Sequence, residues 1–238
     1  MPVSADTGIF IPSLGKILSN VIEVSDIYLY YGTNARWCKF MEVVGLAIIS
    51  LILAYLLGSL NGAYYMVKWK HGIDIRSTGS GNAGATNAGR AMGKKGFLWV
   101  LVFDLAKGML AVLLIRWSGQ TEIIAGLGVI AAVLGHIFPI QLRFRGGKGI
   151  AVSLGALVIF SNQATFLLLA VFLCIYLFVR KFSISGLLAY ACTALLLPFL
   201  RLDMLTIAVY VVVTVLILAA HHTHLKAAWS YMLLRNER

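Results

Sequence analysis

Most of this chain is a series of apolar segments that are long enough, or nearly so, to cross a lipid bilayer. A membrane-spanning helix needs about 20 apolar residues, and such segments lie at 43–67, 97–115, 123–141, 149–160, 164–179, 184–200 and 204–220. Charged residues make up only 12% of the chain, against about a quarter in soluble domains. We therefore expect an all-α integral membrane protein with about seven transmembrane or membrane-embedded helices. The segment 149–160 is short for an untilted crossing, so we expect it to be broken or partly inserted.

The distribution of Lys and Arg predicts the orientation of these helices. Fourteen of the cations outside the spans lie on the side of the loops 68–96 and 143–148 and of the C-terminal tail, and five lie on the other side. Since cytoplasmic loops carry the excess of Lys and Arg, we expect both loops and the C-terminus in the cytoplasm of a multi-pass protein of the cytoplasmic membrane. The net charge of +11 is then explained by this pattern and by anionic lipid or substrate, and no nucleic-acid partner is expected.

Composition divides the chain into three regions. Residues 1–42 form an N-terminal extension of unknown role, without an apolar span of adequate length. Residues 43–222 form the helical membrane domain. Residues 223–238 are predicted to form a cytoplasmic interfacial tail, because apolar residues recur there at helical spacing beside cations.

Two glycine-rich polar loops interrupt the apolar segments and predict a phosphate site. The loop at 79–96 alternates glycine with Ser, Asn, Thr and Arg, and the loop at 143–149 ends in Gly-Gly-Lys-Gly before an apolar helix. Glycine lets backbone N–H groups converge on an anion, and the start of a helix adds a positive dipole end. Neither loop contains a carboxylate, so a bound phosphate meets no repulsion there.

The charged and titratable residues near the loops could serve the structure as well as the function. Asp74 and Arg76 are interpreted as a local ion pair that fixes the first loop. Asp104 and Lys107 share one face of a predicted membrane helix. They are expected to pair, since unpaired charges in a bilayer are costly, and to act structurally or by supporting the residues that contact substrate. His136 fits a buried, hydrogen-bonded histidine as well as a functional one.

Three histidines near the end of the last span suggest either a metal or a phosphate site. His221, His222 and His224 are close in sequence, but helical spacing turns His222 away and no acidic or cysteine partner is near. No metal is therefore expected. A proton acceptor or a phosphate ligand at the cytoplasmic face fits these residues better.

With these motifs, residues 43–226 resemble the bacterial acyl-phosphate:glycerol-3-phosphate acyltransferases, the PlsY-type membrane family. The family's first motif is matched by Gly79-Ser80-Gly81-Asn82, Gly84-Ala85-Thr86-Asn87 and Arg90. Its second motif is matched by Gly135-His136, Pro139 and Phe144-Arg145-Gly146-Gly147-Lys148-Gly149. The order Asp104-Leu105-Ala106-Lys107-Gly108 also resembles the family's DxxKG.

The resemblance implies transfer of a fatty acyl group from acyl phosphate to the 1-hydroxyl of glycerol 3-phosphate. The products are lysophosphatidate and phosphate, in phospholipid biosynthesis and without a cofactor. The implied partners are both substrates, the lipid bilayer and an enzyme that produces acyl phosphate. The residues expected in catalysis are Ser80, Asn82, Lys148 and His221. Those expected to bind substrate are Gly79, Gly81, Thr86, Asn87, Arg90, Lys94, Arg145, Gly146, Gly147, Gly149 and His224.

Residue chemistry is consistent with that reaction. An acyl phosphate carries a good leaving group, so no covalent enzyme nucleophile is required. Backbone N–H groups of 79–82 and the Asn82 amide are expected to stabilise the tetrahedral oxyanion. The general base is either His221 or a phosphate oxygen of a bound substrate. We favour the phosphate, because its dianion titrates near neutrality and is already held in the site.

One motif departs from the family, and two other functions remain as alternatives. His221 matches the histidine of the third motif, but Ala220 replaces the preceding arginine, and His224-Leu225 replaces Asn-Ile. An inactive family member is therefore one alternative. The other is a membrane transporter of phosphate or a phosphorylated metabolite, although the two related halves common in transporters are not visible. No His-x4-Asp pair is present, so acyltransferases that use that dyad are not matched.

Overall fold

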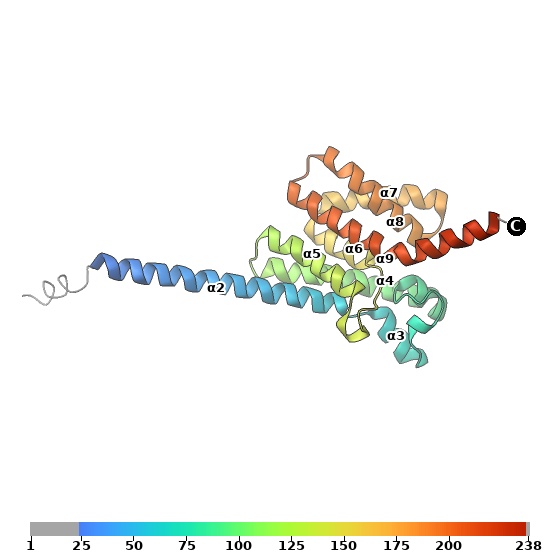
Figure 1. Cartoon of the computed structure of the whole chain (residues 1–238), viewed down its shortest axis with the longest axis horizontal. Helices are drawn as coiled ribbons and strands as arrows, with labels where there is room; N and C mark the ends of the chain where they lie inside the picture. Colours follow the sequence, from blue (N-terminus) through green and yellow to red (C-terminus); the bar gives the residue numbers. More distant parts are fainter. Residues whose placement is uncertain (1–23, 237–238) are drawn as a thin grey trace, which may run out of the picture. The chain divides into compact units, whose positions relative to one another are not determined.

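The computed structural model describes residues 24–236, with side chains described for 36–222, and that range is helical without a strand. Figure 1 shows the helices, which are α2 (Val24–Ser59), α3 (Gly62–His71), α4 (Ala85–Trp117), α5 (Glu122–Ile137), α6 (Ile150–Phe160), α7 (Asn162–Val179), α8 (Phe182–Leu196) and α9 (Met204–Asn236). Short 3-10 turns are η1 (Ile75–Ser77), η2 (Ile140–Leu142) and η3 (Leu197–Leu200).

The prediction of an all-α membrane protein is confirmed. Within the described residues, 6 helices are long and apolar enough to span a membrane, and Ile150–Phe160 is a shorter apolar helix. That short helix is the segment expected to be incomplete as a crossing.

The chain separates into two compact units, Met1–Leu46 and Ala47–Arg238. In the first unit, the described residues belong to α2, and the side chains of 36–43 are exposed. The predicted boundaries at 42/43 and 222/223 stay predictions. The helical backbone of α9 continues through the predicted tail as far as Asn236, while the side chains of 223–238 lie outside the described residues.

A break divides the apolar segment predicted at 43–67. Helix α2 ends at Ser59, and Asn61 takes an extended conformation before α3 begins at Gly62. The Asn61 side chain accepts a 2.8 Å hydrogen bond from the Tyr64 N–H and donates one of 3.0 Å to the Ala83 carbonyl. The capping amide thus starts α3 and fastens it to the first glycine loop.

Helix α4 begins inside the loop predicted at 79–96, so the second half of that loop is helical. Gly93 interrupts the helix with φ 72° and ψ −169°. Further along, α4 packs closely on α6, because a Cβ on Gly108 would collide with the Val152 carbonyl and one on Gly155 with the Leu105 carbonyl. These glycines let the two helix backbones approach each other.

Candidate active site

Three helix N-termini meet at one cavity of about 60 Å³. The cavity is lined at these ends by Gly84, Ala85 and Thr86 of α4, by Gly149, Ile150 and Ala151 of α6, and by Phe182 and Ser183 of α8. The N-cap residues Gly84, Gly149 and Lys181 make no side-chain capping bond. Since the first N–H groups of a helix lack intrahelical partners, the three ends present positive dipoles and backbone donors to an anion.

Polar side chains from five parts of the chain complete the cavity wall. The lining includes Asn82, Asp104, His136, Lys148 and His221. The structure thus brings together residues from both glycine loops, from α4 and α5, and from the last membrane helix. The sequence predicted Asn82, Lys148 and His221 as catalytic residues, and that role stays a prediction.

Lys148 supplies a cation directly before α6. Its side chain is partly buried, and loss of water contact, followed by the neighbouring charge of Arg90, lowers its pKa to about 8. A cation that is poorly hydrated and lies beside another cation gains most when an anion binds. The position therefore suits a phosphate ligand.

The second glycine loop folds back against the end of α5. The N–H groups of Gly146 and Gly147 donate 3.0 Å hydrogen bonds to the carbonyls of Ile137 and His136. A Cβ on Gly146 would collide with the His136 carbonyl, and one on Gly147 would collide with the imidazole Nε2 of His136. These two glycines fix the loop, and the backbone donors at the cavity come from the start of α6.

Asn87 holds the first glycine loop in shape. Its Oδ1 accepts a 3.0 Å hydrogen bond from the Ser80 N–H, and its Nδ2 donates to the carbonyls of Ile75 and Thr78 at 3.1 and 3.0 Å. The Gly81 N–H donates to the Thr78 carbonyl at 3.0 Å. The loop itself thus uses the N–H groups of Ser80 and Gly81. The expectation of oxyanion donors among the backbone N–H groups of 79–82 stays a prediction.

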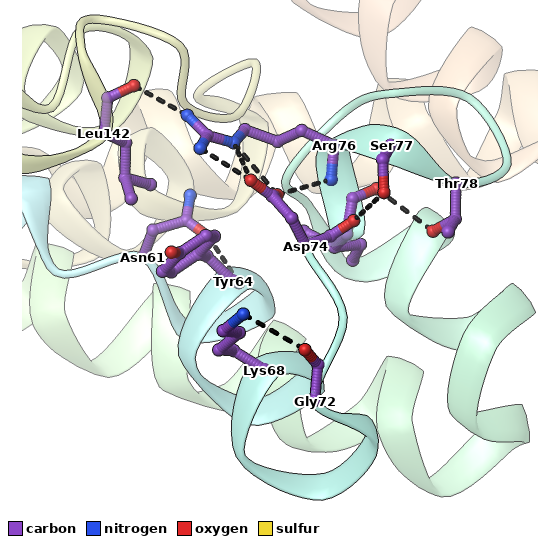
Figure 2. Close-up of polar contacts among 10 residues, drawn as sticks. Asn61, Tyr64, Lys68, Gly72, Asp74, Arg76, Ser77, Thr78 and Leu142 are labelled. Carbon is purple, nitrogen blue, oxygen red and sulfur yellow. Dashed lines mark hydrogen bonds and ion pairs between the residues drawn. The ribbon is translucent and has the colours of Figure 1, made fainter.

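Arg76 connects the approach to the first loop with the approach to the second, as Figure 2 shows. Its guanidinium contacts both Asp74 carboxylate oxygens, the shorter at 2.7 Å, and donates a 2.7 Å hydrogen bond to the Leu142 carbonyl. It also lies 5.2 Å from the centre of the Tyr64 ring. The hydrogen bond to Arg76 is the main cause that lowers the pKa of Asp74. The predicted local ion pair between Asp74 and Arg76 is confirmed. Arg76 also contacts Leu142, which was not predicted.

The predicted pairing inside the membrane is also confirmed. The Nζ of Lys107 lies 2.8 Å from Oδ1 of Asp104, with side-chain exposures of 4% and 2%. His136 is buried and its Nδ1 lies 2.9 Å from the same Lys107 Nζ. His136 is thus both hydrogen-bonded in the core and part of the cavity wall.

Some predicted residues lie away from this cavity. Gly79, Asn87 and Arg90 line a second cavity of about 270 Å³ with His71 and Thr78. Ser80, Gly81, Lys94, Arg145, Gly146 and Gly147 line neither of these two cavities. Lys94 and Arg145 are exposed. The His224 side chain lies outside the described residues.

The structure adds one polar residue that the sequence reasoning missed. Ser183, at the start of α8, lines the first cavity, and its hydroxyl lies 3.1 Å from the Thr86 hydroxyl. Its position two residues after the basic turn Arg180–Lys181, on the side predicted to hold the loops, was the available signal. Among the described residues, no group of three His, Cys, Asp or Glu side chains is arranged to hold a metal.

Fold and site together define a polytopic helical membrane protein with a polar cavity between two glycine-rich loops. Residues 48–230 match the family described as glycerol-3-phosphate acyltransferase. The chain belongs to this family.

Similar proteins come from several bacteria. Glycerol-3-phosphate acyltransferase 1 of Bacillus anthracis is 35% identical over 172 residues, which cover 72% of this chain and 91% of that protein. The Desulfitobacterium hafniense protein of the same name is 39% identical over 173 residues, or 73% of this chain and 86% of that one.

The fold is similar to the crystal structure of PlsY (YgiH), an integral membrane glycerol 3-phosphate acyltransferase, in its glycerol 3-phosphate form. The TM-score is 0.71 at 32% identity, over 77% of this chain and 92% of that one. The lysophosphatidic acid form of PlsY matches with a TM-score of 0.67 at 31% identity, with the same coverage of both chains.

Proposed function

We propose that this protein transfers a fatty acyl group from an acyl phosphate to the 1-hydroxyl of glycerol 3-phosphate. The products are lysophosphatidate and inorganic phosphate. Acylation of glycerol 3-phosphate follows from the family and from the names of its relatives. The acyl phosphate donor is our more specific proposal.

The observation that carries the proposal is the convergence of helices α4, α6 and α8 beside Lys148. Both substrates carry a phosphate, and so does the leaving group. Asp104, the carboxylate in the cavity wall, is paired with Lys107 at 2.8 Å, so its charge is compensated. The site therefore attracts phosphate.

The reaction needs alignment and charge stabilisation more than a reactive side chain. The glycerol hydroxyl oxygen attacks the acyl carbonyl carbon, the bond from that carbon to the phosphate oxygen breaks, and phosphate leaves with the bonding electrons. Holding the two substrates together contributes through orientation. Lys148, the Asn82 amide and the helix N-termini stabilise the negative charge that develops.

The hydroxyl proton has two possible acceptors. We propose a phosphate oxygen of a bound substrate, because a phosphate dianion titrates near neutrality and lies within the site. His221 lines the same cavity and is the competing base. Ser80 and the remaining predicted residues of the first loop act in this proposal by binding or positioning substrate.

We also propose that the reaction occurs at the cytoplasmic face of the cytoplasmic membrane. The excess of Lys and Arg on the side of both glycine loops supports this orientation. An acyl phosphate must then come from an enzyme that makes it on the same side. We propose the same three regions as before: an N-terminal extension at 1–42, a membrane domain at 43–222 and a cytoplasmic tail at 223–238.

The test gives purified protein labelled glycerol 3-phosphate with palmitoyl phosphate, palmitoyl-CoA or acyl carrier protein loaded with palmitate. We expect lysophosphatidate from palmitoyl phosphate alone. Lys148→Ala should lose most turnover, and Lys95→Ala should not, because Lys95 is an exposed cation of the first loop that lines neither cavity. Product from palmitoyl-CoA but not from palmitoyl phosphate would overturn the donor assignment.

Two further results would support the alternatives. No product from any donor would favour an inactive member, particularly in view of Ala220 in the third motif. Uptake of labelled glycerol 3-phosphate into vesicles, without acylation, would favour a transporter.

A further inference from the structure

A buried lysine joins three parts of the fold next to the site. The Nζ of Lys107 lies 2.6 Å from the Leu60 carbonyl, 2.8 Å from Asp104 Oδ1 and 2.9 Å from His136 Nδ1. An ammonium group has three N–H donors. Lys107 therefore forms hydrogen bonds to the break between α2 and α3 and to α5, and an ion pair with Asp104 on α4.

This arrangement fixes where His136 carries its proton. An ammonium group donates but cannot accept, so His136 Nδ1 must be the acceptor of the bond from Lys107. The proton of the neutral imidazole then resides on Nε2. The charges of Asp104 and Lys107 compensate each other, so the neutral imidazole adds no uncompensated charge to this buried cluster.

The Nε2 of His136 lies where the two glycine loops meet. A Cβ built on Gly147 would collide with this nitrogen, and it would also come within 2.8 Å of the Ala83 carbonyl. His136 shares the cavity wall with Asn82 and Lys148. The lysine thus holds one nitrogen of the ring, while the other lies against Gly147 and the ring lines the cavity.

We propose that His136 donates a hydrogen bond from Nε2–H to an anionic oxygen of the bound substrate, and that Lys107 and Asp104 position it. The anionic oxygen is identified through the proposed function, as a phosphate oxygen or the tetrahedral oxyanion. A neutral N–H donor stabilises such an oxygen without giving up its proton. His136 is therefore not the general base, and Lys107 acts through His136 by fixing its tautomer.

The tautomer can be measured without any assay of activity. We would record nitrogen-15 NMR spectra of the histidine-labelled wild-type protein in lipid nanodiscs and assign the His136 signals with His136→Gln. We expect a neutral ring protonated on Nε2 between about pH 6 and 8, and a mixture of tautomers in Lys107→Met. A wild-type ring protonated on Nδ1, or on both nitrogens, would overturn the proposal.

Two substitutions separate the donor from a structural role. His136→Gln keeps an N–H near the Nε2 position, whereas His136→Asn keeps only a group near Nδ1 that can pair with Lys107. We expect kcat/KM to fall by about 10-fold or less in the Gln variant and by about 100-fold or more in the Asn variant. If KM rises, His136 donates its hydrogen bond to the phosphate of bound substrate. If kcat falls instead, His136 donates to the tetrahedral oxyanion.

Equal losses of kcat/KM in both variants, or a higher kcat/KM in the Asn variant, would overturn the proposal. The hydrogen bond from Lys107 to Nδ1 would then matter more than a donor at Nε2. Thermal unfolding of both variants checks that they fold. Failure of the proposed function gives a different result. None of the acyl donors would then support acylation of glycerol 3-phosphate by the wild-type protein, while the Nε2–H tautomer would still be observed.

Discussion

The Arg76 guanidinium donates a 2.7 Å hydrogen bond to the Leu142 carbonyl, 66 positions along the chain. Arg76 lies in η1, directly before the first glycine loop, and Leu142 ends η2, directly before the second. Asp74 holds the guanidinium from the other side. The arginine therefore fixes the spacing of the two loops, and its charge is compensated by a carboxylate instead of being presented to substrate.

Replacing Arg76 should change turnover more than folding. In Arg76→Lys the charge is kept, but the planar fork that reaches both Asp74 and Leu142 is lost. We expect kcat/KM for glycerol 3-phosphate to fall by about 10-fold, with a larger loss in Arg76→Met. Steady-state acylation assays measure this, together with the midpoint of thermal unfolding.

Arg116 offers a matched control for Arg76. It pairs with the Glu122 carboxylate at 2.8 Å and also donates to the Ile159 carbonyl, in a cavity that shares no residue with the candidate site. Arg116→Met should leave kcat/KM unchanged. Equal losses of activity in both arginine variants would contradict a specific role of Arg76.

A side chain at position 147 should displace the ring of His136. In Gly147→Ala the new Cβ would collide with Nε2 and approach the Ala83 carbonyl. Overpacking of this kind costs about 1–3 kcal/mol, so we expect a lower unfolding midpoint and a large loss of activity. Gly45→Ala is the control, since nothing lies within 4 Å of a Cβ there. Unchanged activity in Gly147→Ala would contradict the close contact.

The activity should decrease at alkaline pH as Lys148 loses its proton. Burial and Arg90 lower the pKa of this lysine to about 8, so its cation is present below that pH and is lost above it. We expect kcat/KM to fall with an apparent pKa near 8 in the free enzyme. In Lys148→Arg the alkaline limb should move above pH 10, because arginine stays protonated. If the alkaline limb of the pH profile does not move in this variant, the loss of activity comes from the titration of another group.

The sequence predicted those parts of the structure that depend on local pattern. The spans follow from runs of apolar residues, because a helix needs about 20 of them to cross a bilayer. The Asp74–Arg76 and Asp104–Lys107 pairs are neighbours along the chain, so their contacts could be expected. The break at Asn61 was missed because an apolar run continues on both sides of it.

Contacts between distant residues were not predictable in this way. Nothing in the spacing indicates that Lys107 reaches His136, or that Ser183 reaches Thr86. Asn87 shows a second limit, because a motif reveals which residues occur together but not what each one contacts. Its amide holds the loop through three hydrogen bonds, and a direct substrate contact by Asn87 stays a prediction.

Loss of the Ser183 hydroxyl should weaken the α8 side of the site moderately. The hydroxyl oxygens of Ser183 and Thr86 are hydrogen-bonded at 3.1 Å in the cavity wall. We expect Ser183→Ala to raise KM for one of the two substrates by about 3- to 10-fold, as a neutral hydrogen bond contributes about 1 kcal/mol. Separate titrations of acyl phosphate and glycerol 3-phosphate show which one. Unchanged KM values for both would exclude Ser183 from binding.

The two histidines of the cavity differ in the nitrogen that carries the proton. His221 Nδ1 lies 2.7 Å from the Ile217 carbonyl, which can only accept, so Nδ1 is the protonated nitrogen and Nε2 of the neutral ring is the basic one. Of the two, His221 is therefore the histidine able to serve as general base. His221→Gln removes that basicity. If a substrate phosphate takes the proton, kcat should stay within about 10-fold of the wild-type value, because general-base catalysis is worth about 100- to 10,000-fold. A fall of kcat in that larger range, with unchanged KM values, would assign the base to His221 instead.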